Sequence, residues 1–435
     1  MSDSNDFSVE IYQNEYLARG ATEVNAVVTV TSSGTAVPAT GKYAEVIIVD
    51  TSGSMHHPPT KLSAAKQATT AAIDTLRDGV DFAIVAGTDR ARLVYPAQGL
   101  VPADARTRAE ARNAVSALRA GGGTAIGSWL RLADTLFAGH PGSIRHAILL
   151  TDGQNMHEKP SQLARAVESV TGHFVCDCRG VGDEWKVEEL RTVAEALLGT
   201  VDIAPEPEEL EADFRAMAAS AMGKAVSDVA LRVWTPQDAR VRFVKQVEPV
   251  LTDLTARRKD SAPRSGDYPT GSWGRETRDY HVCVEVPAAG TGEKMLAARI
   301  SVVAPGASAE EDTVLAKGNV LAVWTDDTAL STRINREVAH YTGQAELADA
   351  IQEGLEARKA GDVETATSRL GRAVALATES GHTVTAKLLA KVVDIDDPVT
   401  GTVRLKRAVS TVDEMTLDTR SSKTMRVRKQ QSTES

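Results

Sequence analysis

The chain is poor in cysteine, and it has no long run of apolar residues. It has only three cysteines in 435 residues, too few for a disulfide framework, and such a low count is typical of a protein from a reducing cytoplasm. The first six residues are polar and acidic, whereas a secretory signal needs basic residues followed by an apolar core. No segment reaches the roughly 18 consecutive apolar residues of a membrane span. We therefore expect a cytoplasmic protein without a membrane span.

The chain also has fewer basic than acidic residues. Lys and Arg number 49 against 59 Asp and Glu, which gives a formal net charge of −10. A surface that follows nucleic-acid phosphates needs the opposite balance, so we do not expect a nucleic-acid partner. The remaining composition, 42% hydrophobic and 25% charged, is that of a soluble globular protein. Its length suggests roughly three domains.

Two of the cysteines, Cys176 and Cys178, flank Asp177 in a predicted strand over residues 173–179. A redox or metal-binding role is one interpretation of this spacing. We favour the alternative that both are buried strand residues, because a free cysteine commonly behaves as a small hydrophobic side chain.

The clearest feature of the sequence is a strand that runs into a polar loop. Residues 46–49 form an unbroken apolar run rich in β-branched side chains, which predicts a parallel strand covered on both faces. Asp50 ends the run, and Ser52 and Ser54 follow at alternate positions. Three oxygen-bearing side chains can therefore point the same way at the carboxyl end of a strand, where α/β sheets place ligand sites. Such hard ligands suit Mg²⁺ or Mn²⁺, although the same residue types also dominate ordinary turns.

Two further stretches strengthen the metal-site interpretation. Residues 121–124 place Thr124 between a glycine loop and a predicted helix over residues 126–137, whose N-terminal dipole would face the metal loop. Residues 148–152 form a second apolar strand that ends in Asp152. In this order, the three stretches resemble the von Willebrand factor A (VWA) domain of bacterial, non-secreted proteins, over roughly residues 42–202. The resemblance implies a doubly wound, Rossmann-like α/β fold with a metal-ion-dependent adhesion site (MIDAS).

The resemblance also implies roles for five residues in that site. Ser52 and Ser54 would bind the metal through their hydroxyls, Thr124 would be the ligand from the second loop, and Asp50 and Asp152 would act directly or through water. The implied function is a non-enzymatic adaptor or scaffold. An Asp or Glu of a protein partner would complete the coordination of Mg²⁺ or Mn²⁺.

Other functions remain open at this point. A metal-dependent hydrolase is one, because an open Mg²⁺ position beside Asp50 and Asp152 could activate water. That chemistry needs a general base, and the loops offer only His56 and His57, which we expect to be exposed. An ATPase is disfavoured because residues 121–124 lack the lysine of a phosphate-binding loop. An extracellular adhesin would share the metal site but conflicts with the polar start of the chain.

The pattern of the chain predicts several domains. Residues 1–38 carry N-terminal strands and a linker at 33–38, and residues 40–223 alternate strands with helices as a parallel α/β domain does. Alternating apolar positions return over residues 227–326, which predicts an antiparallel β-sandwich. We expect the N-terminal strands to pair with this sandwich, so that the α/β domain is an insertion within it.

The last two predicted segments are helical and polar. Residues 330–395 have helical spacing, with Gly361 and Asp362 as a stop and a cap resembling the turn of one tetratricopeptide-type helix hairpin. Residues 396–435 are predicted to be a polar tail, mobile from about Asp413. Its Thr416, Thr419 and Thr424 suggest a phosphorylation switch for a phosphopeptide reader of the forkhead-associated (FHA) type, with an unpartnered, solvated tail as the alternative.

Overall fold

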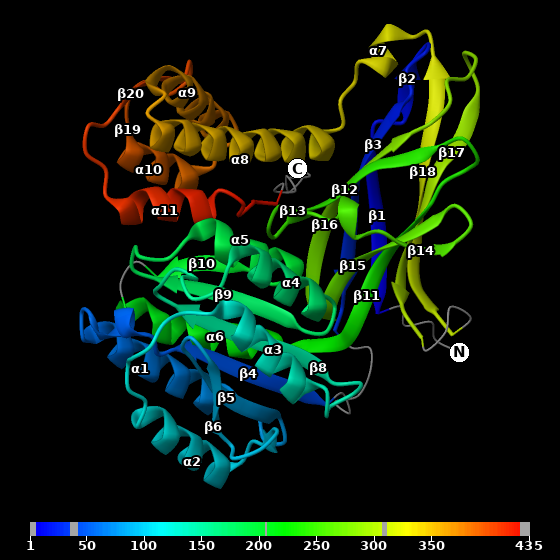
Figure 1. Cartoon of the computed structure of the whole chain (residues 1–435). Coiled ribbons are helices and arrows are strands. Elements are labelled where there is room, and N and C mark those ends of the chain that lie inside the picture. Colours follow the sequence, from blue (N-terminus) through cyan, green and yellow to red (C-terminus); the bar gives the residue numbers. More distant parts are fainter. Residues whose placement is uncertain (1–5, 35–41, 205–206, 307–310, 427–435) are drawn as a thin grey trace, which may run out of the picture. The chain divides into compact units, whose positions relative to one another are not determined.

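The computed structural model describes residues 6–34, 42–204, 207–306 and 311–426 (Figure 1). The chain separates into an α/β unit, made of Ala36–Ser227 and Ser410–Thr419, and a β-rich unit, made of Met1–Thr35, Asp228–Val409 and Arg420–Ser435. Most of the linker predicted at 33–38, and residues 427–435 of the predicted tail, lie outside the described residues. Within the described ranges, no helix combines the length and the hydropathy needed to cross a membrane.

The α/β unit is built on a seven-stranded sheet with the strand order β10-β9-β8-β4-β5-β6, in which β7 also pairs with β5. The strands from β10 to β5 are parallel, whereas β6 and β7 run antiparallel to β5. Continuous apolar runs form the central strands because both faces of a parallel sheet are covered. The strands are β4 (Tyr43–Asp50), β5 (Asp81–Gly87), β6 (Ala91–Tyr95), β7 (Val101–Pro102), β8 (Ile144–Thr151), β9 (Val175–Val181) and β10 (Val201–Ala204).

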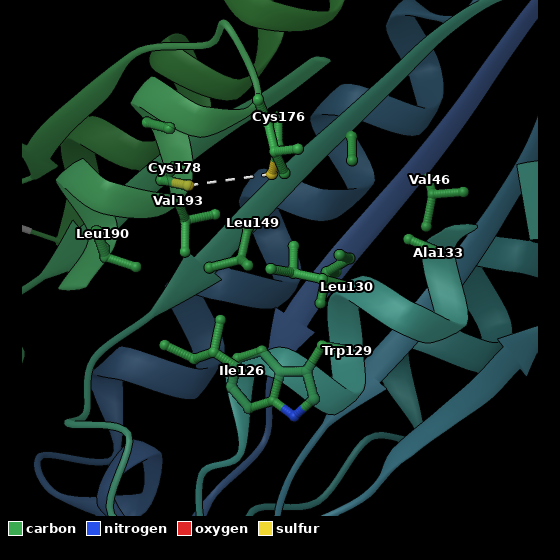
Figure 2. Close-up of a cluster of buried hydrophobic side chains, with 14 of the residues drawn as sticks. Val46, Ile126, Trp129, Leu130, Ala133, Leu149, Cys176, Cys178, Leu190 and Val193 are labelled. Atoms are coloured by element: carbon green, nitrogen blue, oxygen red, sulfur yellow. Dashed lines mark hydrogen bonds between the residues drawn. The ribbon is translucent and has the colours of Figure 1, made fainter. Parts of the chain in front are cut away.

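Helices cover both faces of this sheet, which confirms the doubly wound α/β fold. One face packs against α1 (Thr60–Thr75), α2 (Ala105–Ser116) and α6 (Leu210–Met222), and the other packs against α3 (Ile126–Phe137), α4 (Pro160–Val170) and α5 (Val187–Ala196). Figure 2 shows part of the core on the second face, a cluster that contains Trp129 and Leu130 of α3 as well as Cys176 and Cys178 of β9. The sulfurs of Cys176 and Cys178 are 4.0 Å apart and fully buried. They are therefore buried strand residues.

Two mainly antiparallel sheets form the β-rich unit. Their strand orders are β1-β3-β16-β12-β13 and β14-β15-β11-β17-β18-β2, and the rings of Phe7 and Trp273 join the two sheets with centroids 5.6 Å apart. β3 pairs antiparallel with β16, which confirms the predicted pairing of the N-terminal strands. The strands are β1 (Phe7–Gln13), β2 (Tyr16–Ala18), β3 (Glu23–Ser32), β11 (Lys224–Trp234), β12 (Arg240–Glu248), β13 (Thr252–Asp253), β14 (Lys259–Ala262), β15 (Ser265–Gly274), β16 (Glu276–Glu285), β17 (Lys294–Ala304) and β18 (Thr313–Thr325).

Helices follow the strands of the β-rich unit. They are α7 (Thr328–Ser331), α8 (Arg336–Ala360), α9 (Val363–Glu379) and α10 (Thr383–Val392). Gly361 ends α8 with a φ of 79°, a left-handed conformation that favours glycine. The side chain of Asp362 then accepts a hydrogen bond of 3.0 Å from the backbone N–H of Thr365 and caps α9. The predicted stop and cap are thus confirmed, and α8 packs against α9.

The prediction of a polar, mobile tail is wrong for the described part of residues 396–435. A hairpin of β19 (Val393–Asp397) and β20 (Thr402–Leu405) is followed by α11 (Thr411–Arg420). Met415 of α11 is buried in a core of the α/β unit, and Val412 packs against the same core. Average composition is a poor guide here, because a short helix needs only one apolar face to pack.

Candidate functional site

The loops that end β4 and β8 meet at the carboxyl edge of the parallel sheet. Because these strands are neighbours, Asp50 at the end of β4 lies beside Thr151 at the end of β8. The Asp50 carboxylate is fully buried and accepts hydrogen bonds from the Ser52 backbone N–H, at 2.7 Å, and from the Thr151 hydroxyl. Burial raises the pKa of Asp50 to about 6 despite these bonds. A nearby cation would favour its charged form.

The two serines connect this loop to Asp152. The hydroxyl oxygens of Ser52 and Ser54 are 3.0 Å apart, and Ser54 donates a hydrogen bond of 2.7 Å to Asp152 Oδ1. Ser52 and Asp152 are buried, whereas Ser54 is partly exposed. The structure therefore brings together four of the five predicted site residues. Ser52, Ser54 and Asp152 are connected through their side-chain oxygens, and Asp50 is joined to them by the backbone N–H of Ser52.

The loop that carries Thr124 is held against the first loop by backbone hydrogen bonds. The Gly53 N–H donates to the Gly122 carbonyl at 3.0 Å, and the Gly121 N–H donates to the Thr51 carbonyl at 2.8 Å. These two hydrogen bonds place the second loop beside the serines of the first.

Thr124 is placed beside the other hydroxyls, with Gly153 between them. A Cβ built on Gly153 would lie 3.1 Å from Ser54 Oγ and 3.4 Å from Thr124 Oγ1. His157, which the sequence analysis did not single out, contacts the backbone of Thr124 twice. The Thr124 N–H donates to His157 Nδ1 at 3.1 Å, and the His157 N–H donates to the Thr124 carbonyl at 3.0 Å. No spacing rule in the sequence points to this histidine.

Lys61 is the second contributor that sequence reasoning missed. It lies in the first turn of α1, and its side chain is 7% exposed. Its Nζ donates to Asp152 Oδ2 at 2.9 Å and to Glu184 Oε2 at 2.8 Å. Burial lowers the pKa of Lys61, but its bonds to Glu184 and Asp152 outweigh burial and raise the pKa overall. Both oxygens of Asp152 are thus engaged, one by a hydroxyl and one by an ammonium.

The N-terminus of α3 is occupied by side chains of the same chain. The N–H of Ile126 donates to Asn155 Oδ1 at 2.9 Å, and that of Gly127 donates to Glu158 Oε2 at 2.8 Å. The positive end of this helix dipole, which would favour an incoming carboxylate, already meets the carboxylate of Glu158.

The side chains at the site fit a hard divalent cation. They offer hydroxyl and carboxylate oxygens, the ligands preferred by Mg²⁺ and Mn²⁺. Within the described ranges, no group of three or more His, Cys, Asp and Glu side chains could hold a metal ion. A metal site at this edge would depend on the hydroxyls of Ser52, Ser54 and Thr124 as well as on Asp50 and Asp152.

Comparison with known families identifies two parts of the chain. A model described as the von Willebrand factor type A domain matches residues 45–203, and a model described as the von Willebrand factor type A C-terminal domain matches residues 375–421. The first match contains all five predicted metal ligands, and the second contains α11. No curated protein matches the chain.

Solved structures match the chain to different extents. A von Willebrand factor type A protein from Catenulispora acidiphila is 53% identical, with a TM-score of 0.92, and the match covers 98% of this chain and 99% of that one. The ArnB paralog VWA2 from Sulfolobus acidocaldarius is 13% identical, with a TM-score of 0.58 over 95% of this chain and 98% of that one, a likeness of fold alone. Proximal thread matrix protein 1 from the mussel byssus, with a zinc-occupied MIDAS motif, is 22% identical over 45% of this chain and 48% of that one, with a TM-score of 0.37.

Proposed function

Because the chain belongs to the von Willebrand factor type A family, we propose that its α/β unit is a protein-interaction module that depends on a divalent metal ion. Ser52, Ser54, Thr124, Asp50 and Asp152 would hold Mg²⁺ or Mn²⁺, and an Asp or Glu side chain of a protein partner would complete the coordination. The observation that carries this proposal is the hydrogen-bonded set of site residues. The Ser52 backbone N–H bonds to buried Asp50, and the hydroxyls of Ser52 and Ser54 lead on to buried Asp152.

The residues around the site favour binding over catalysis. A hydrolase needs a general base that can reach a metal-bound water. His56, which ends a short 3-10 helix, and His57, which follows it, are both exposed. His157 is a further candidate, but its Nδ1 already accepts the hydrogen bond from the Thr124 backbone. We therefore propose a non-enzymatic adaptor or scaffold and keep the metal-dependent hydrolase as the alternative.

The setting that we propose is the cytoplasm. Cys176, Cys178 and Cys283 are all unpaired and buried, as is usual for proteins of a reducing compartment. The phosphopeptide reader expected at the tail is not part of this proposal, since its premise was a tail unable to fold. Thr416 and Thr419 lie buried in α11, where a kinase could not reach them unless the helix detached.

Calorimetry of the full-length protein with Mg²⁺ and Mn²⁺ tests the metal site. We expect the wild type to bind an ion, and Asp50→Ala to bind at least about tenfold more weakly, because a buried charged ligand is lost. Asp78→Ala is the matched control, since it removes a carboxylate whose side chain is 82% exposed. Equal binding by the wild type and Asp50→Ala, or binding by neither, would contradict the assignment.

Capture of partners from the lysate of the native host tests the interaction itself. We expect at least one protein to bind in the presence of Mg²⁺, to be released by EDTA and to be lost with Asp50→Ala. Its binding should also fail when the acidic side chain that reaches the ion is replaced by its amide. A partner that is retained equally in EDTA would show that the interaction does not need the metal.

A further inference from the structure

We propose that Lys61 is a built-in cation that weakens ion binding at the metal site, so that the divalent ion exchanges readily instead of being a permanent part of the fold. This inference rests on the proposed function. The ammonium group of Lys61 lies 2.9 Å from Asp152 Oδ2.

Asp152 is shared between two kinds of partner. Its Oδ1 accepts a hydrogen bond from Ser54 within the set of oxygens, and its Oδ2 accepts one from Lys61. The carboxylate is fully buried, so water does little to separate its charge from that of the ammonium. An ion that bound through Asp152 would therefore share this carboxylate with a positive charge already in place.

Helix stability does not explain why a lysine occupies this position. Lys61 lies in the first turn of α1, where the helix dipole disfavours a cation, and its side chain is 7% exposed, which costs an ammonium much of its hydration. A buried ion pair offsets such costs without adding much stability over an apolar pair. The positive charge beside Asp152, paired also with Glu184, is the feature of this position that a neutral residue could not provide.

Two opposing effects decide what happens when the ammonium is removed. The loss of a side chain that orients a metal ligand commonly lowers metal affinity by about 10- to 100-fold. The loss of a nearby positive charge raises the affinity for the metal ion. We expect the second effect to prevail, because Ser54 still orients Asp152 in the absence of Lys61. The remaining partner of Lys61, Glu184, has a side chain that is 58% exposed and so neutralises the ammonium only in part.

The test is calorimetry of full-length variants with MgCl₂ and MnCl₂. Lys61→Met keeps the length of the side chain and removes its charge, and we expect it to bind either ion at least about tenfold more tightly than the wild type. Lys61→Arg keeps the charge and should stay within about threefold of the wild type. Lys66→Met is the matched control. Lys66 lies on the same helix, its Nζ donates to the Ser116 carbonyl at 2.9 Å, and its replacement should leave ion affinity unchanged.

Glu184→Gln gives a second measurement, at a side chain that is itself 58% exposed. It removes the other carboxylate that neutralises Lys61, so ion binding should weaken by about two- to fivefold. Thermal melting of each variant shows whether it is folded. If Lys61→Met does not fold, a Glu184→Gln variant that binds ions as well as or better than the wild type overturns the proposal.

The outcomes separate this inference from the proposed function. If the wild type binds an ion and a folded Lys61→Met binds it equally or more weakly, Lys61 does not weaken the site and the inference alone is wrong. If neither the wild type nor any variant binds an ion, the metal site is wrong and the inference falls with it.

Discussion

Arg191 of α5 donates a hydrogen bond of 2.7 Å to the carboxylate of Asp418 in α11, across 227 residues of sequence. Both side chains are largely buried, with 18% and 8% of their surfaces exposed. Met415, on the same helix as Asp418, is buried in a core that also contains Leu190 and Val193 of α5. The last described helix is therefore part of the α/β unit, far from it in sequence but joined to it by a charged pair and an apolar side chain.

Replacing either member of this pair should destabilise the α/β unit. We expect Asp418→Ala to lower the free energy of unfolding by about 1.5–3 kcal/mol, since a charge-assisted hydrogen bond is lost and Arg191 keeps a largely buried charge. Urea unfolding measures this change. Arg165→Ala, on the exposed face of α4, is the control and should cost less than about 0.5 kcal/mol. An Asp418→Ala variant as stable as that control would show that α11 does not depend on the pair.

His146 should make stability depend on alkaline pH. Its ring nitrogens lie 2.9 Å from Glu45 Oε1 and 3.0 Å from Asp177 Oδ2. Burial lowers the pKa of His146, but the two carboxylates outweigh it and raise the pKa to about 10. A raised pKa in the folded state contributes stability that is fully present below the unfolded pKa, about 6.5, and is lost as the pH rises through about 10.

The measurement is urea unfolding of the wild type and His146→Gln at about pH 6, 8 and 9.5. The wild type should exceed the variant in stability at low pH, and the difference should shrink towards pH 9.5. His173→Gln is the control, because the side chain of His173 is 50% exposed. A difference that is constant across this range would mean that His146 is neutral in the folded protein.

Gly153→Ala should damage the metal site without unfolding the protein. The added methyl group would lie 3.1 Å from Ser54 Oγ and 3.4 Å from Thr124 Oγ1, within the space that an ion between these hydroxyls would need. We expect at least about tenfold weaker binding of Mn²⁺ in calorimetry and a change in unfolding free energy of about 1 kcal/mol or less. Gly121→Ala is the control, because a Cβ there has no neighbour within 4 Å. Equal ion affinity in the two variants would place the ion elsewhere.

In the Asp50→Asn variant, a divalent ion should stabilise the folded protein much less than it stabilises the wild type. Burial disfavours the charged Asp50 side chain, as its pKa of about 6 indicates. In EDTA, the neutral variant should therefore melt at or above the wild type. With Mn²⁺ at about 100 times the wild-type dissociation constant, the wild type should gain about 2.7 kcal/mol, and a variant that binds at least tenfold more weakly should gain about 1.4 kcal/mol or less. A variant stabilised by the ion as much as the wild type would exclude Asp50 as a ligand.

Several elements could be predicted because their signals are local. The apolar run of residues 46–49 predicts a buried parallel strand, and Gly361 with Asp362 predicts a helix stop and cap. The helix α4 was not predicted, although the pattern was present. Its buried Leu163, Ala166, Val167 and Val170 follow helical spacing.

The sequence by itself determined the alternation of strands and helices, and the three stretches in which Asp50, Thr124 and Asp152 lie, because strand periodicity and loop composition are properties of neighbouring residues. Only the tertiary structure decided that Lys61 faces Asp152, 91 residues away, and that α11 returns to the α/β unit. A lysine in a first helical turn, or a short polar segment near a terminus, has the same local pattern whether it is exposed or buried. Its surroundings depend on how helices pack against the sheet, and that packing is set by contacts far apart in the chain.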